Sequence, residues 1–188
     1  MNILGHTFVA LAVGGDEPEY LLGAMLPDLA PMAGVKVARG ALVGALREGV
    51  RCHLRADDAF HAHPDFRAGS GALRRALAER GVESGPARAV GHAGWELLLD
   101  GTLVRTPVED AFRRAMAVGD RAATAMGPDD RARWAAFLAR GRTSPGLGYD
   151  DPRWVADRLH AMLARRPRLR LPEDQVAPVA AVLGGHVD

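Results

Sequence analysis

Hydrophobic residues recur at helical spacing along most of the chain, and polar residues fill the positions between them. Alternating runs of β-branched and aromatic residues, which are typical of strands, are absent, and aromatic residues make up only 5% of the sequence. The pattern therefore predicts an all-α protein.

Prolines and glycines mark where the expected helices begin and end. The first helix should end at Gly14 and Gly15, and Pro27 and Pro31 should interrupt the chain around Asp28. The pattern predicts helices over residues 2–13, 17–26, 41–63, 65–80, 86–100, 107–127, 128–141, 154–166 and 172–183, with a loop over 141–152. Short connections between about eight helices predict a single-domain helical bundle.

Composition supports one globular domain over residues 1–188, because 48% of the residues are hydrophobic and 25% are charged. A formal net charge of +1 argues against a dedicated nucleic-acid-binding protein. No apolar run reaches the ~18 residues that a membrane span needs, and no basic segment precedes the apolar start, so we expect a cytoplasmic protein. Cys52 is the only cysteine, which excludes a cysteine-rich zinc site.

Two predicted helices carry polar stripes of metal-ligand type. His53, Asp57 and His61 are spaced i, i+4, i+8 and so share one helix face. The segment GHAGWELLLDG repeats this spacing with His92, Glu96 and Asp100 on an otherwise apolar helix. Burying carboxylates without partners costs several kcal/mol each, and a bound cation between the stripes would remove that cost.

Two single residues extend the pattern. His6 lies in an apolar predicted helix, and Asp28 follows Pro27 at a predicted helix end. Taken alone, His6 would be a hydrogen-bonded core histidine, Asp28 a cap or turn residue, and each stripe a solvated helix face. Together they favour one metal site with His6, Asp28, His53, Asp57, His92 and Glu96 as ligands.

Four segments resemble the acyl carrier protein phosphodiesterase family, a helical group related to HD-domain phosphohydrolases. MNILGHTFVALA is similar to the family's MNFLAHxxLA opening, and LLGAMLPDL is similar to its GNxxxDF segment. GVRCHLRADDAFHAHPDFR is similar to GIRLHRRIDxFTDxHPxxR without a gap, and AVGHAGWELLLDG stands where the family has LDxxxDHFLA. The chain also resembles, more distantly, zinc-dependent phospholipase-like helical hydrolases.

The departures from the family pattern concern the site. Leu54 replaces a basic residue and Leu97 replaces a histidine, while His61, His92 and Glu96 stand at aspartate positions. Most of these exchanges keep groups that can bind metal, but they make the set richer in nitrogen. Such sites suit Zn, Fe or Mn better than Mg or Ca, so we expect one or two divalent ions of the first kind.

The resemblance implies an HD-domain-like fold and a metal-dependent hydrolase. Its substrate would be a phosphoester, and in the family this is a phosphopantetheinylated carrier protein. Metal-bound water would attack phosphorus, Arg55 would offset charge on the phosphoryl oxygens, and His61 or His63 would protonate the leaving alkoxide. Two alternatives stay open: a metal enzyme of other chemistry, such as an iron oxygenase or a phosphatase, and a non-catalytic helical interaction protein.

Overall fold

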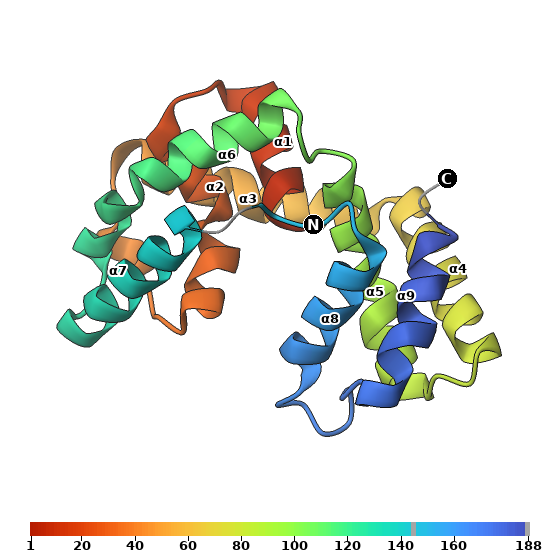
Figure 1. Ribbon diagram of the computed structural model, residues 1–188. Coiled ribbons are helices and arrows are strands. Elements are labelled where there is room, and N and C mark those ends of the chain that lie inside the picture. Colours follow the sequence, from red (N-terminus) through yellow and green to blue (C-terminus); the bar gives the residue numbers. More distant parts are fainter. Residues whose placement is uncertain (144–145, 187–188) are drawn as a thin grey trace. The chain divides into compact units, whose positions relative to one another are not determined.

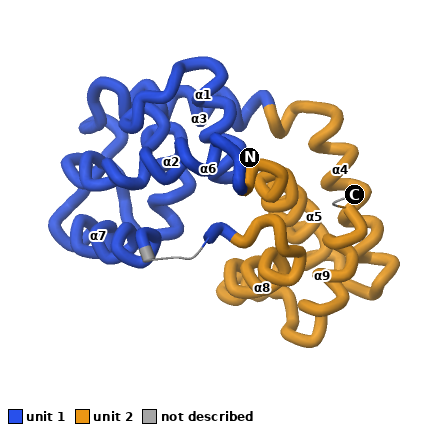
Figure 2. Tube along the Cα trace, turned by 45° about the horizontal axis from the view of Figure 1, so that its top comes forward, with its two compact units in different colours: residues 1–59, 105–147 blue, residues 60–104, 148–188 orange. Residues whose placement is uncertain are grey.

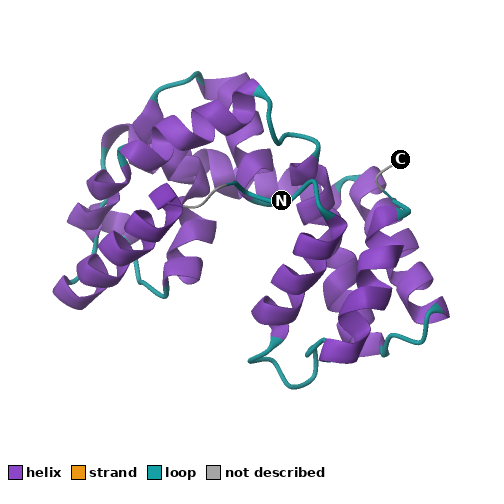
Figure 3. Cartoon of the chain, viewed as in Figure 1, coloured by secondary structure: helices purple, strands orange, loops and turns teal. Residues whose placement is uncertain are grey.

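The computed structural model describes residues 1–143 and 146–186, and these residues form helices and connecting segments without a strand (Figure 3). The prediction of an all-α protein is confirmed. In the described part of the chain the α-helices are α1 (Ile3–Gly14), α2 (Pro18–Ala33), α3 (Gly44–Ala62), α4 (Pro64–Glu79), α5 (Ser84–Gly101), α6 (Pro107–Ala117), α7 (Pro128–Thr143), α8 (Pro152–Leu163) and α9 (Val176–Gly184) (Figure 1). Three 3₁₀ helices complete the set: η1 (Arg39–Ala41), η2 (Gly119–Ala125) and η3 (Glu173–Gln175).

The helices form two compact units, and each unit is built from two separate stretches of the chain (Figure 2). Unit 1 comprises residues 1–59 and 105–147, and unit 2 comprises residues 60–104 and 148–188. The first boundary falls within α3. The prediction of one domain stays a prediction, because two interleaved units can belong to one domain or to two, and so does the likeness to HD domains.

The core of unit 1 is organised around α2, which packs against α1, α6, α7 and η2. Leu21, Leu22 and Met25 of this helix are fully buried. Trp134 of α7 is also fully buried, and its indole Nε1–H donates a 2.9 Å hydrogen bond to the carbonyl of Gly119. Burial of each such large apolar side chain stabilises the unit by roughly 1.5–3 kcal/mol.

The prediction that Pro27 and Pro31 interrupt the chain is wrong, because α2 continues through both prolines to Ala33. Each proline inside a helix costs about 3 kcal/mol, but burying one large apolar side chain gains roughly 1.5–3 kcal/mol. Eight residues of α2 are buried, so packing outweighs the local cost. Asp28 therefore projects from the body of a helix and not from a break. Gly34, in the left-handed conformation at φ 67°, ends the helix instead.

Unit 2 contains the packed pairs α4 with α5 and α8 with α9, and α5 also packs against α8. Gly94 of α5 lies where three side chains from other helices converge, those of Leu73, Leu159 and Leu183. A glycine at this point lets the neighbouring helices approach α5 closely.

The predicted helix over 107–127 is shorter in the structure, since α6 ends at Ala117 and η2 follows. The predicted helix over 41–63 begins at Gly44. Of the helices in the described residues, none combines the length and the apolar character that crossing a membrane would require.

Two glycines allow α2 and α3 to pack closely. A Cβ on Gly49 would lie 2.1 Å from the carbonyl oxygen of Tyr20 and 2.7 Å from the amide nitrogen of Ala24. Because these are backbone atoms, we expect Gly49→Ala to lower the free energy of unfolding by about 1–3 kcal/mol in urea titrations. Gly40→Ala is the matched control, since no atom lies within 4 Å of its Cβ position. Equal stability of the two variants would contradict close packing at Gly49.

Glu109 holds the start of α6. Its carboxylate accepts a 2.7 Å hydrogen bond from the backbone amide of Arg105 and another hydrogen bond from the guanidinium of Arg113. Arg105 has a φ of 59°. The hydrogen bond from the Arg105 amide lowers the pKa of Glu109 below its ordinary value. Burial raises this pKa, and the hydrogen bond and positive charge of Arg113 lower it further. Ionised Glu109 therefore stabilises the folded protein at pH values above the pKa that Glu109 has in the unfolded chain. This stabilisation is lost as pH falls through the pKa of Glu109 in the folded protein.

We expect Glu109→Gln to lower the free energy of unfolding by about 1–3 kcal/mol at pH 7. The difference from the unmodified protein should shrink as pH falls below about 4.5, where the carboxylate of the unfolded chain becomes protonated. Urea titrations from pH 7 to pH 3 measure this difference in the free energy of unfolding. Glu79→Gln is the control, because Glu79 is exposed. A difference that stays constant from pH 7 to pH 3 would show that ionised Glu109 is not the source.

Candidate metal centres

Side chains of metal-ligand type gather in two clusters, one within each unit. The first cluster consists of His6, Asp28 and His53, with Asp57 beside His6. The second cluster consists of His61, His92 and Glu96. In each named triplet the ligand atoms lie within 4.8 Å of one another. Helix α3 contributes residues to both clusters. His53 and Asp57 precede the unit boundary and belong to the first cluster, and His61 follows the boundary and belongs to the second.

His6 is the centre of the first cluster and is almost completely buried in α1. Its ring stacks on that of His53, with centroids 3.8 Å apart and planes 21° from parallel. Its Nε2 lies 3.6 Å from Oδ2 of Asp28 and 3.6 Å from Oδ1 of Asp57. One imidazole nitrogen thus faces two carboxylates that come from different helices.

His53 is oriented by the backbone of α2. Its Nδ1 lies 2.8 Å from the carbonyl oxygen of Ala24. A carbonyl only accepts hydrogen bonds, so Nδ1 carries the proton and Nε2 keeps its lone pair. Burial lowers the pKa of His53, so that its imidazole is neutral at pH 7, although the bond to Ala24 opposes this shift. The ring is therefore held in the tautomer that a metal ligand needs.

Pro27 lies within α2, one turn after the segment that His53 contacts. Proline has no N–H, so the carbonyl of Gly23 lacks its usual partner four residues later. His53 contacts the carbonyl of the next residue, Ala24, where Gly49 of α3 approaches the backbone of α2 closely.

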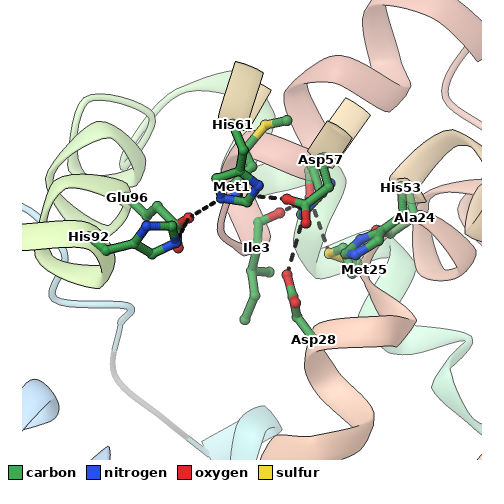
Figure 4. Close-up of polar contacts among 12 residues, drawn as sticks. Met1, Ile3, Ala24, Met25, Asp28, His53, Asp57, His61, His92 and Glu96 are labelled. Carbon is green, nitrogen blue, oxygen red and sulfur yellow. Dashed lines mark hydrogen bonds and ion pairs between the residues drawn. The ribbon is translucent and has the colours of Figure 1, made fainter. Parts of the chain in front are cut away.

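The two carboxylates of the first cluster connect it to solvent. The side chains of Asp28 and Asp57 are 32% and 34% exposed, whereas that of His6 is only 1% exposed. The ammonium group of Met1 lies 2.9 Å from Oδ1 of Asp57 (Figure 4). The cluster thus has a buried nitrogen side and an accessible oxygen side.

The donor set of the first cluster fits a divalent ion. Two ligands that each lie about 2.1 Å from an ion are about 3.0 Å apart at a right angle and about 3.4 Å apart at a tetrahedral angle. The 3.6 Å separations around His6 exceed this range by only a few tenths of an ångström. Two imidazoles with two carboxylates suit Mn, Fe or Zn.

Glu96 is the centre of the second cluster. Its Oε1 lies 2.8 Å from Nε2 of His61 and 3.2 Å from Nε2 of His92 (Figure 4). Burial would raise the pKa of Glu96, but the hydrogen bond from His92, a nearby positive charge and the hydrogen bond from His61 together outweigh burial and lower that pKa to about 2. The carboxylate is therefore ionised at neutral pH.

Phe66 packs against both imidazoles of the second cluster. Its ring meets those of His61 and His92 edge-on, at centroid distances of 5.0 and 5.1 Å. The two imidazoles are stacked 5.0 Å apart with planes 16° from parallel. These contacts limit the rotation of both rings.

The remaining site candidates lie elsewhere. His63 is exposed, and its Nδ1 accepts a 3.3 Å hydrogen bond from the amide of Asp65 at the start of α4. Arg55 is also exposed and lines a surface hollow of unit 1 that contains no member of the first cluster. Asp100, expected on the stripe of His92 and Glu96, is buried within α5. The catalytic roles of His63 and Arg55 stay predictions.

All six predicted ligands belong to the two clusters, and His61, predicted as a proton donor, is the seventh member. Its spacing of eight residues from His53 is the signal that could have identified it. The role of the Ala24 carbonyl was missed, because a backbone acceptor has no signal in the sequence. A single site that gathers all six ligands stays a prediction.

No family model, curated protein or solved structure matches this chain. The resemblance to acyl carrier protein phosphodiesterases therefore stays a prediction that rests on the sequence segments alone.

Removal of one carboxylate should weaken metal binding by the first cluster. We expect Asp28→Asn to lower the affinity for Mn(II) by at least about a hundredfold, because even the loss of a group that only orients a ligand costs about 10–100-fold. Electron paramagnetic resonance of free Mn(II) during titration measures the affinity. The control is Asp58→Asn, which removes an exposed carboxylate of α3 outside the cluster. Similar affinities of the two variants would exclude Asp28 as a ligand.

Proposed function

We propose that this protein is a metal-dependent hydrolase of phosphoesters and that the first cluster is its active site. The observation that carries the proposal is the 2.8 Å contact between Nδ1 of His53 and the carbonyl of Ala24. It leaves Nε2 of a buried neutral imidazole available beside His6 and two carboxylates. A histidine that only packed in the core would not need ionisable partners around it.

His6, Asp28, His53 and Asp57 would hold the ion, with Mn, Fe or Zn as candidates. A divalent ion bound there would lower the pKa of a bound water to about 7 and would offset negative charge on a phosphoryl oxygen.

The protein side of the chemistry follows from burial and charge. His6 and His53 are buried and exclude water from one side, while the half-exposed Asp28 and Asp57 admit water and substrate from the other. Oδ1 of Asp57 lies 3.6 Å from Nε2 of His6, so this carboxylate would serve as a ligand of the ion at the accessible edge. The proposed roles of Arg55, His61 and His63 rest on the sequence resemblance alone.

The substrate proposal follows the same resemblance. The match of residues 49–67 with the family pattern points to a phosphodiester that links a phosphopantetheine arm to a carrier protein. Such a substrate would present its phosphoryl group to the accessible oxygen side of the first cluster.

Loss of Asp57 should remove activity without unfolding the protein. We expect Asp57→Ala to lower kcat/KM for a phosphodiester such as bis(p-nitrophenyl) phosphate by at least about a hundredfold, since it removes a ligand of the ion. Chelator should abolish activity of the unmodified protein, and added Mn(II) should restore it. The matched control is Asp58→Ala, the neighbouring exposed carboxylate.

Full activity of Asp57→Ala, or activity that survives complete removal of metal, would contradict the proposed function. Release of phosphopantetheine from a loaded carrier protein, followed by mass spectrometry, tests the narrower substrate proposal. Hydrolysis of the small phosphodiester without any release from the carrier would retain the hydrolase and reject the carrier protein as substrate.

A further inference from the structure

The second cluster brings three ligand atoms to one point. Nε2 of His61 and Nε2 of His92 both face a single oxygen, Oε1 of Glu96, at 2.8 and 3.2 Å. Ligands of an ion at about 2.1 Å are about 3.0–3.4 Å apart, so these separations already approximate the edges of a coordination shell. Only small shifts of the side chains would place an ion among them.

The local structure prepares this arrangement. His92 and Glu96 are one turn apart on α5, and His61 lies in the last turn of α3 just before Pro64 starts α4. Phe66 packs edge-on against both imidazoles, and the near-parallel rings present the same nitrogen to the carboxylate. The side chains come from two helices and are all members of unit 2.

Exposure separates this cluster from an ordinary buried hydrogen-bond network. The side chains of His61 and His92 are 33% and 52% exposed, while that of Glu96 is 14% exposed. An ion could enter from solvent and bind the two imidazoles against a nearly buried carboxylate. Three protein ligands would leave further coordination positions for water or a substrate atom.

We propose that His61, His92 and Glu96 form a metal site of their own, which takes a zinc-class divalent transition metal independently of the first cluster. Two imidazoles and one carboxylate are the ligand set of catalytic zinc sites and of non-haem iron sites. In the metal-free state each facing nitrogen donates its N–H to Glu96. Before Nε2 can bind the ion, its proton must leave. In a neutral ring this proton moves to Nδ1, and in a ring protonated at both nitrogens it is released to solvent. The proposal does not depend on phosphoester hydrolysis.

Calorimetric titration of the metal-free full chain with Zn(II) tests the proposal by stoichiometry. We expect about two equivalents for the unmodified protein, because each cluster offers three or more ligands. Glu96→Gln keeps the shape of the side chain but not its charge, and it should bind about one equivalent fewer. Asp28→Asn, which changes only the first cluster, should keep the equivalent that Glu96→Gln loses.

His92→Ala serves as a second variant of the site, and His63→Ala is its matched control because His63 is exposed and lies outside the cluster. His92→Ala should lose the same equivalent as Glu96→Gln, and His63→Ala should lose none. Far-ultraviolet circular dichroism checks that each variant remains helical. Long-range ¹⁵N spectra of the histidine rings should show Zn(II) shifting Nε2 of His61 and His92.

The outcomes distinguish this site from the proposed function. One equivalent that is lost in Glu96→Gln but kept in Asp28→Asn would support the second cluster and count against the first. One equivalent that is lost equally in both variants would mean a single shared ion and would overturn an independent site. Unchanged binding in both Glu96→Gln and His92→Ala would also overturn it.

Discussion

The hydrogen bond between His53 and the carbonyl of Ala24 is the interaction on which the first cluster depends. It joins α3 to α2, fixes the tautomer of a buried imidazole and leaves Nε2 available as a ligand. Close approach of the same helices at Gly23 and Gly49 brings the ring within reach of that carbonyl. Helix packing and the chemistry of the cluster are thus parts of one constraint.

The two clusters differ in ways that follow from their surroundings. In the first cluster buried imidazoles meet two half-exposed carboxylates, and in the second partly exposed imidazoles meet one nearly buried carboxylate. A larger share of oxygen ligands favours harder ions such as Mn(II), and a larger share of nitrogen ligands favours Zn(II) or Fe(II). One chain could therefore discriminate between ions by the ratio of its nitrogen and oxygen ligands.

Helical periodicity was sufficient to predict the all-α fold and most helices, because apolar spacing records which face is buried. It failed at Pro27 and Pro31, where the local cost of proline is visible in the sequence but the burial of α2 is not. The stripes of α3 and α5 predicted members of both clusters, since residues four apart share a face. They did not reveal that His61 joins His92 and Glu96, because pairing between helices depends on tertiary packing.

We expect the first cluster to bind a divalent ion through Nε2 of His53. Anomalous diffraction at the manganese edge, from crystals of the chain grown with Mn(II), would locate this ion. The expected result is a peak within bonding distance of Nε2 of His53, Nε2 of His6 and Oδ2 of Asp28, with Nδ1 of His53 still hydrogen-bonded to the carbonyl of Ala24. A map without a peak among these atoms, at Mn(II) concentrations that saturate binding in solution, would contradict it.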